Sequence, residues 1–281
     1  MSKTTLVLDS TQISQFLTCP TMWKLHNLEL LELNGFGKSA MDMGTYGHSL
    51  LEHYYKLVAG GIDETGARDA ALKGPEPVDK LSSIEIGTVR KTFMYYCERY
   101  KGCDFQPSSP DSVEVGFSYK LFEDENRLYL LEGKMDGHSF GPSVGMFDNQ
   151  RMFIDHKFQL RAHQLYNKRI QFRNYALATN SLYGMINYIR FHKNPTEDTF
   201  VREVIPFSRQ ELELWREKLI RVYDRLAENV NKGMFPQNWA SCEGYYGRPC
   251  QYTLICEQDI PMVQENVKQM RYHQIEKWRP W

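Results

Sequence analysis

Apolar positions follow two different periods along the chain, and together they predict an α/β protein. Helical spacing runs through residues 41–57 and 84–100, where apolar side chains recur three or four positions apart. Runs rich in β-branched and aromatic residues lie at 113–122 and 128–131, and a further apolar run at 152–154 follows a group of turn residues. The segments of the first kind are predicted helices, and those of the second kind are predicted strands.

The two ends of the chain carry clear cap and stop signals. Near the N-terminus, Asp9 and Ser10 can cap a helix from Thr11, whose apolar face would comprise Ile13, Phe16 and Leu17. Near the C-terminal third, Ser208 can cap a long amphipathic helix that ends at Gly233. Helices are therefore expected to flank the strands on both sides in sequence.

The segments between these helices give further elements. Within 41–57, Thr45 can cap a helix that carries Leu50, Leu51, Tyr54 and Leu57, and residues 58–80 look like a loop or a short helix. A helix is predicted at 163–183, and strands at 185–191 and 200–207. The expected fold is a mixed sheet flanked by helices.

Two carboxylates lie at or beside the ends of predicted strands. The run 128–131 leads into Asp136, and 152–154 leads directly into Asp155. An antiparallel pair of these strands would bring both carboxylates to one end of a sheet, where their oxygens suit Mg²⁺ or Mn²⁺. Lys157 would project from the same face as Asp155, because side chains alternate along a strand. An acid-x-Lys triplet alone occurs by chance in many chains, so its neighbours decide its meaning.

Composition limits the class of protein without naming a function. The chain has 281 residues, of which 42% are hydrophobic, so it can form one large domain or two small ones. The net charge of −1 neither supports nor excludes nucleic-acid binding. The first residues carry no signal-peptide pattern, and no apolar run approaches the ~18–20 residues of a membrane span. We therefore expect a soluble cytoplasmic protein whose six cysteines are thiols or metal ligands.

The motifs Gly133-Lys134-Met135-Asp136 and Asp155-His156-Lys157 resemble those of the PD-(D/E)xK nuclease superfamily, in its RecB-like branch. Two further features are similar to that branch. Gln171 and Tyr175 stand four apart on a predicted helix, as in its Gln-x-x-x-Tyr motif, and His48 follows Gly44 on another. Without the resemblance, these residues would be read as ordinary helix faces.

The resemblance implies a role for each of these residues. Asp136, Asp155 and Lys157 would be catalytic. Asp136 and Asp155, with His48 and the backbone carbonyl of His156, would bind Mg²⁺ or Mn²⁺, and Gln171 and Tyr175 would contact DNA. RecB-like enzymes also have a glutamate in the strand that Glu114 begins. By this resemblance Glu114 could lie near the metals, but we expect it to be solvated.

The cysteines resemble those of the CRISPR-associated iron–sulfur exonucleases. The order Ser10, Ile13, Phe16, Cys19-Pro20, Trp23 is similar to the opening signature of that family. Cys242, Cys250 and Cys256 match its C-terminal ligands, although the first spacing is longer than usual. Four thiolates suit a [4Fe–4S] cluster or tetrahedral Zn²⁺, and the resemblance favours the cluster. Cys97 and Cys103 are expected to be structural thiols.

The whole pattern implies one nuclease domain over 1–281, with its core at about 40–207. A metal cluster would clasp segments of about 10–25 and 236–257 together. The expected activity is that of a Mg²⁺- or Mn²⁺-dependent exonuclease acting on single-stranded DNA or DNA ends. Partners would come from CRISPR adaptation, phage recombination or repair. The alternatives are an inactive relative that binds DNA or protein, and a site-specific endonuclease.

Overall fold

The structure, a computed structural model, describes residues 3–35, 38–102, 107–140, 150–159, 170–243 and 249–276. The chain divides into two compact units. Unit 1 comprises residues 1–36, 118–132 and 214–281, and unit 2 comprises residues 37–117 and 133–213. Both predicted clasp segments belong to unit 1, and most of the predicted nuclease core belongs to unit 2. The single domain over 1–281 stays a prediction.

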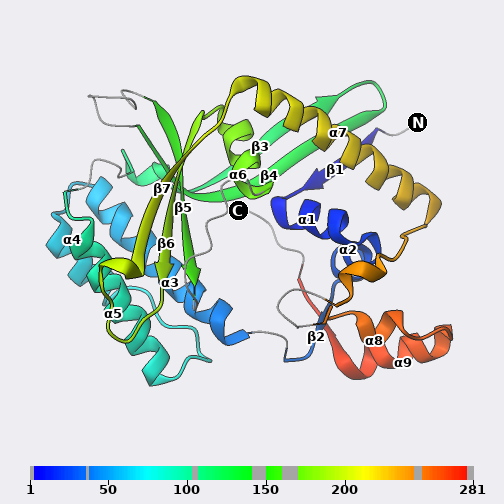
Figure 1. Ribbon diagram of the computed structural model, residues 1–281, viewed down its shortest axis with the longest axis horizontal. Coiled ribbons are helices and arrows are strands. Elements are labelled where there is room, and N and C mark those ends of the chain that lie inside the picture. The colour runs from blue at the N-terminus through cyan, green and yellow to red at the C-terminus, as the bar shows by residue number, and fades with distance from the viewer. Residues whose placement is uncertain are drawn as a thin grey trace. The chain divides into compact units, whose positions relative to one another are not determined.

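The described part of the chain contains both helices and strands (Figure 1). The α-helices are α1 (Ser10–Thr18), α2 (Pro20–Asn27), α3 (Lys38–Ala59), α4 (Glu64–Ala71), α5 (Ser83–Arg99), α6 (Ile170–Thr179), α7 (Arg209–Lys232), α8 (Thr253–Cys256) and α9 (Pro261–Arg271). The strands are β1 (Thr4–Leu8), β2 (Leu31–Leu33), β3 (Val113–Glu123), β4 (Arg127–Phe140), β5 (Arg151–Gln159), β6 (Tyr183–Arg190), β7 (Phe200–Pro206) and β8 (Tyr272–Gln274).

Among the described residues, six strands form one mixed sheet. Their hydrogen-bonded order is β1-β4-β5-β6-β7, with β3 paired to β4. β1 runs parallel to β4, and β5 runs parallel to β6, whereas the β4–β5 and β6–β7 pairs are antiparallel. The predicted α/β fold with a mixed sheet is confirmed, and so is the antiparallel pairing of the strands that carry Asp136 and Asp155.

In unit 2, helices cover both faces of the sheet. Phe153 of β5 packs against Phe172 and Tyr175 of α6. His156, three positions further along β5, stacks on Tyr55 of α3. Because successive side chains of a strand point to opposite faces, α6 lies on one face of β5 and α3 lies on the other (Figure 1). An apolar core of this unit lies on the α3 side and includes residues of α4 and α5.

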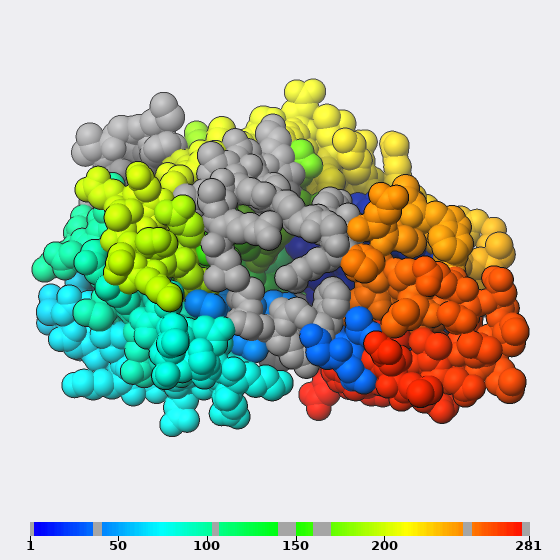
Figure 2. All heavy atoms as spheres, turned by 60° about the horizontal axis from the view of Figure 1, so that its bottom comes forward, coloured from blue at the N-terminus to red at the C-terminus, as the bar shows by residue number. Residues whose placement is uncertain are grey.

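In unit 1, the N-terminal and C-terminal segments fold together. A capping box begins α1, since Asp9 accepts from the backbone of Gln12 while the Gln12 side chain accepts from the backbone of Asp9. β2 pairs with β8, so residues 31–33 and 272–274 share a small sheet. In Figure 2 the orange and red atoms of the C-terminal segment form a continuous area of surface, and α9 within it has no buried residue.

Three predicted boundaries and one predicted face are wrong. Thr45 does not cap a helix, because α3 already begins at Lys38 and Thr45 Oγ1 donates to the carbonyl of Met41 within it. α6 ends at Thr179 because Asn180 adopts a left-handed conformation (φ 52°), so Tyr183 begins a strand instead. β4 extends through Asp136 to Phe140 as one strand, so Asp136 lies within it. Leu17 is exposed, although Ile13 and Phe16 are buried as predicted.

The predictions for residues 58–80, for the two ends of α7 and for Cys97 agree with the structure. The segment 58–80 contains a short helix, α4, which is one of its two predicted forms. Ser208 caps α7 by accepting a hydrogen bond from the backbone of Glu211, and Gly233 follows the helix with a positive φ of 64°. Cys97 is buried in α5, in agreement with a structural thiol, and Cys103 lies outside the described residues.

Candidate metal centre and active site

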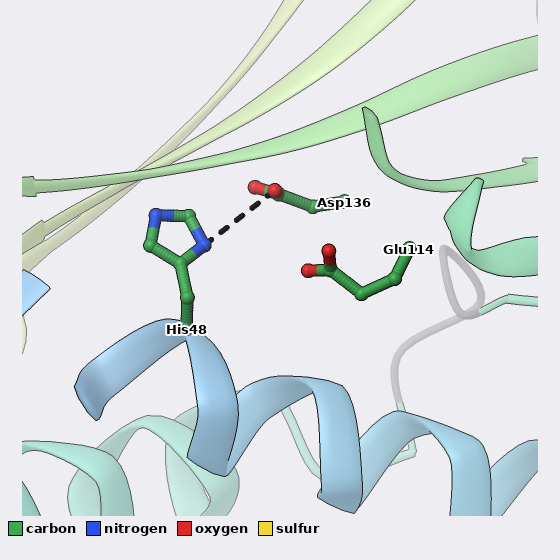
Figure 3. A group of neighbouring side chains, drawn as sticks. All are labelled: His48, Glu114 and Asp136. Atoms are coloured by element: carbon green, nitrogen blue, oxygen red, sulfur yellow. Dashed lines mark ion pairs between the residues drawn. The ribbon is translucent and has the colours of Figure 1, made fainter. Parts of the chain in front are cut away.

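His48, Glu114 and Asp136 bring one ligand atom each to the same small volume of unit 2. These three atoms all lie within 4.8 Å of one another. Figure 3 shows the imidazole of His48, from α3, facing the carboxylate of Asp136, from β4, with the Glu114 carboxylate beside them. His48 Nδ1 lies 3.5 Å from Asp136 Oδ1. An imidazole and two carboxylates form a donor set that suits a divalent cation.

Glu114 belongs to this group, contrary to the expectation that it is solvated. Its side chain is 14% exposed, and it forms an ion pair of 2.7 Å with Lys134 Nζ. Its backbone has a φ of 57°, a left-handed conformation that is uncommon for residues other than glycine. Such backbone conformations persist only where the surrounding structure holds them, and they cluster at functional sites. Periodicity could not have placed this side chain, because a positive φ breaks the alternation of a strand.

Asp155 lies at the start of a second chain of contacts, on the α6 face of the sheet. Lys157 Nζ approaches Asp155 Oδ2 at 2.8 Å, and Gln171 Nε2 donates to Asp155 Oδ1 at 3.3 Å. Gln171 Nε2 also lies 2.7 Å from the Tyr175 hydroxyl, which donates to the carbonyl of Lys134 at 2.6 Å. The predicted shared face of Asp155 and Lys157 and the predicted neighbourhood of Gln171 and Tyr175 are thus present in the structure.

The two aspartates respond to their surroundings in opposite ways. Burial raises the pKa of Asp155 to about 6, because it outweighs the attraction to Lys157, and the repulsion from Asp136 adds to the rise. Burial acts in the same direction on Asp136, but His48, His156 and Lys157 outweigh it and lower the pKa of Asp136. Burial disfavours protonation of His48, yet the Asp136 carboxylate prevails and raises the pKa of His48. Perturbed pKa values of this kind cluster at functional sites. A bound cation would require both carboxylates to be deprotonated.

His156 contacts the buried side chain of Asn187, which in turn contacts Arg202. Arg202 Nε donates to Asn187 Oδ1 at 2.6 Å, and Asn187 Nδ2 lies 3.0 Å from His156 Nδ1. Because Arg202 can only donate, Asn187 must accept from it through Oδ1 and donate to His156 through Nδ2. His156 is therefore neutral and carries its proton on Nε2, in agreement with burial that lowers the pKa of His156 to about 3.

These side chains fit a hard divalent cation. The ligand atoms are carboxylate oxygens and an imidazole nitrogen, which Mg²⁺ and Mn²⁺ accept. Asp155 Oδ2 is buried and accepts no hydrogen bond with good geometry from the described residues, so its contact is the ion pair with Lys157. A carboxylate oxygen left in this state retains the capacity to bind a cation.

The four predicted cluster ligands all lie in unit 1. Cys19 lies between α1 and α2, Cys242 and Cys250 flank a segment outside the described residues, and Cys256 ends α8. Burial raises the pKa of Cys256 to about 11, and the other three thiols add to the effect. No three of the four Sγ atoms lie within 4.8 Å of one another. The metal cluster itself stays a prediction.

Other predicted site features are only partly described. Arg161, Lys168 and Arg169, basic residues shortly before Gln171 in the sequence, lie outside the described residues. Arg173 forms an ion pair of 3.6 Å with Glu211. Tyr175 is buried, and its hydroxyl bonds within the site, so contact of Gln171 and Tyr175 with DNA stays a prediction. Within the part of the chain that the structure describes, no helix is both long and apolar enough to span a membrane.

A family model described as the PD-(D/E)XK nuclease superfamily matches residues 10–257. The chain belongs to the PD-(D/E)XK nuclease superfamily. The resemblance seen in the motifs is thus confirmed at the level of the superfamily, which places the protein among hydrolases that act on nucleic acid with divalent metals. The matched range contains both aspartates, Lys157 and the four cysteines.

Two solved structures are similar to this chain. SSO0001 is 13% identical with a TM-score of 0.41, and the alignment covers 92% of this chain and 88% of that one. A proposed exonuclease from Eubacterium rectale is 11% identical with a TM-score of 0.47, with 90% of this chain and 94% of that one covered. No curated protein is similar enough to match.

Proposed function

We propose that the protein hydrolyses DNA phosphodiester bonds with Mg²⁺ or Mn²⁺ and acts as an exonuclease. The observation that carries this proposal is the arrangement of Asp136, Asp155 and Lys157 in unit 2 of a chain of this superfamily. The two aspartates lie on antiparallel neighbouring strands, and Lys157 is ion-paired to the second of them. This is the constellation after which the superfamily is named.

The ligands of the divalent ion would be Asp136, Asp155, His48 and the backbone carbonyl of His156, as the resemblance implies. The position of Glu114 supports its addition to this set, since its carboxylate lies within 4.8 Å of the ligand atoms of His48 and Asp136. When bound, the ion would act as a Lewis acid that activates water and offsets charge on the phosphate.

The protein groups would then position and protect the reacting atoms. Lys157, held by Asp155 at 2.8 Å, would orient the attacking water or neutralise charge that develops on the phosphate. Gln171 holds the other oxygen of Asp155 and so limits its rotation. The backbone N–H of His156 donates to Asp136 Oδ2, which ties the two metal-binding strands together at this point. On this proposal, Gln171 also contacts the substrate strand.

Cys19, Cys242, Cys250 and Cys256 would bind a structural [4Fe–4S] cluster, because hydrolysis needs no electron transfer. Four thiolates also suit tetrahedral Zn²⁺, which is the alternative. The resemblance of the cysteine pattern to the iron–sulfur exonucleases favours the cluster over a single zinc ion.

The test is cleavage of end-labelled single-stranded and double-stranded DNA by purified protein with Mg²⁺, Mn²⁺ or EDTA. We expect stepwise shortening from an end with either metal and none with EDTA. Discrete internal fragments would instead support a site-specific endonuclease. Binding of DNA without cleavage under every metal condition would support the inactive relative. If the protein neither binds nor cleaves DNA, the proposal of a DNA substrate is overturned.

A further inference from the structure

The backbone and the side chain of Lys134 have different partners in the site. Its carbonyl accepts the hydrogen bond of 2.6 Å from the Tyr175 hydroxyl, while its Nζ forms the ion pair of 2.7 Å with Glu114 Oε2. The first contact fixes the position of the residue. The second places a flexible ammonium group on a carboxylate that also belongs to the candidate metal centre.

The charge of Glu114 needs this partner when no cation is bound. Burial raises the pKa of Glu114, and the nearby Asp136 carboxylate raises it further, whereas the Lys134 ammonium lowers it. The backbone of Glu114 also holds a left-handed φ of 57°, which sets the direction in which its side chain leaves β3. Lys134 is therefore the cation that compensates a constrained carboxylate.

The ammonium group and a divalent cation would compete for this carboxylate. Glu114 can serve as a ligand of a cation only if that cation approaches the same group that Lys134 now approaches at 2.7 Å. Two cations on one carboxylate repel each other strongly in a site of low dielectric constant. The backbone of Lys134 is fixed, but its side chain is 38% exposed and has room to move away.

We propose that Lys134 is the resident counter-ion of Glu114, which holds this carboxylate in the metal-free protein and leaves it when Glu114 binds a divalent cation. This inference rests on the proposed metal centre. It assigns to Lys134 a role separate from that of Lys157, whose partner is Asp155. It also makes Lys134 a determinant of metal affinity.

The direct test is calorimetric titration of the metal-free full chain with Mn²⁺ alone. Lys134→Met removes the ammonium group and keeps most of the side-chain length. Loss of one partly exposed ion pair should tighten Mn²⁺ binding by about 2- to 5-fold. Lys232→Met is the control, because Lys232 forms an ion pair of similar length, 2.6 Å, with Glu228 on α7, at a more exposed position. Glu114→Gln should weaken Mn²⁺ binding.

The outcomes separate the inference from the proposed function. Unchanged or weaker binding by Lys134→Met, with Glu114→Gln weaker than wild type, would overturn the role of Lys134 and keep the metal centre. Wild-type binding that neither Glu114→Gln nor Asp136→Asn changes would overturn the metal centre itself.

A second measurement needs no variant and therefore does not depend on how a variant folds. Amine acylation of the wild-type protein, followed by mass spectrometry of the peptides, reports how free each lysine is. We expect Mn²⁺ to increase the modification of Lys134 and to leave Lys232 unchanged. Equal modification of Lys134 with and without Mn²⁺, under conditions where the ion is bound, would contradict the exchange.

Discussion

The Asp136 carboxylate accepts a hydrogen bond from the backbone N–H of His156, one position beyond Asp155. The regular pairing of β4 with β5 ends at Gly137 and Ile154, so this bond lies just past it. A side chain thus continues the contact of the two strands where their backbones part. This bond holds the Asp136 carboxylate next to the backbone that carries Asp155, and so it limits the distance between the two carboxylates.

This link leads to a prediction for the aspartates. Asp136→Asn and Asp155→Asn each retain the side-chain shape but remove the negative charge that a cation needs. We expect cleavage to fall by about 10³-fold or more, since metal-centred charge stabilisation accounts for several kcal/mol. Steady-state cleavage rates measure the loss, and circular dichroism checks that the fold is retained. Cleavage at the wild-type rate by both variants would remove the site as described.

The same charges predict a gain in stability for metal-free Asp155→Asn. Asp155 is 1% exposed and lies near a second carboxylate, so its ionised form is costly in the absence of a cation. Neutralising it should raise the melting temperature of the metal-free protein at pH 8. Adding Mn²⁺ should stabilise the wild type and have little effect on the variant, because a ligand stabilises only a state that it binds. Thermal unfolding with EDTA and with Mn²⁺ measures both effects.

His48 and His53 offer a matched pair on one helix. His48 lies 3.5 Å from Asp136, whereas the His53 ring packs close to Gly74. His48→Ala should weaken Mn²⁺ binding by about 10- to 100-fold, as the loss of a group that binds or orients the metal does in other centres. His53→Ala should leave the affinity close to that of wild type. Equal losses at the two positions would mean that His48 has no special role.

The fold and the first candidate residues could be predicted because they depend on local patterns. The strands before Asp136 and Asp155 are apolar runs bounded by turns, and the spacing of Gln171 and Tyr175 fixes their common face on α6. Glu114 could not be placed in this way. Its position depends on a left-handed backbone and on Lys134, which is twenty residues later in the chain.

The supporting contacts of His156 were equally invisible to sequence analysis. Asn187 and Arg202 lie on β6 and β7, so their contact with His156 depends on the order of the strands in the sheet. The end of α6 was missed for another reason. Asn180 adopts a left-handed conformation that a polar run such as Thr-Asn-Ser permits without requiring it.

The contact of Asn187 with His156 predicts an effect at a distance from the metal ligands. Asn187→Leu leaves Arg202 and His156 without their shared partner and should lower cleavage about 10-fold or more, as loss of a group behind a metal ligand does. Thr92→Val is the control, since Thr92 is as deeply buried as Asn187 in the same unit. A similar loss of activity in both variants would indicate general destabilisation, whereas a larger loss in Asn187→Leu, at equal melting temperature, indicates positioning.

The last prediction concerns the cysteines of unit 1. Cys19 lies more than two hundred residues before Cys242 in the sequence, yet both influence the pKa of Cys256. A cluster bound by all four thiolates would therefore close most of the chain into one loop. Because metal binding to the folded state contributes to the free energy of folding, loss of one ligand should destabilise the N-terminal and C-terminal segments together.

Cys19→Ser and Cys256→Ser should each lose iron and unfold at a lower temperature, and Cys97→Ser is the control. Cys97 is buried in α5 of unit 2, so its replacement should change packing without changing iron content. Iron, sulfide and zinc analysis of anaerobically purified protein, with a broad absorbance at about 400 nm for thiolate-bound iron, measures the outcome. One zinc ion per chain, lost in Cys19→Ser, would keep the four-cysteine site and replace its metal. Equal metal content in wild type and Cys19→Ser would exclude Cys19 as a ligand, because an ion that it binds cannot survive its loss unchanged.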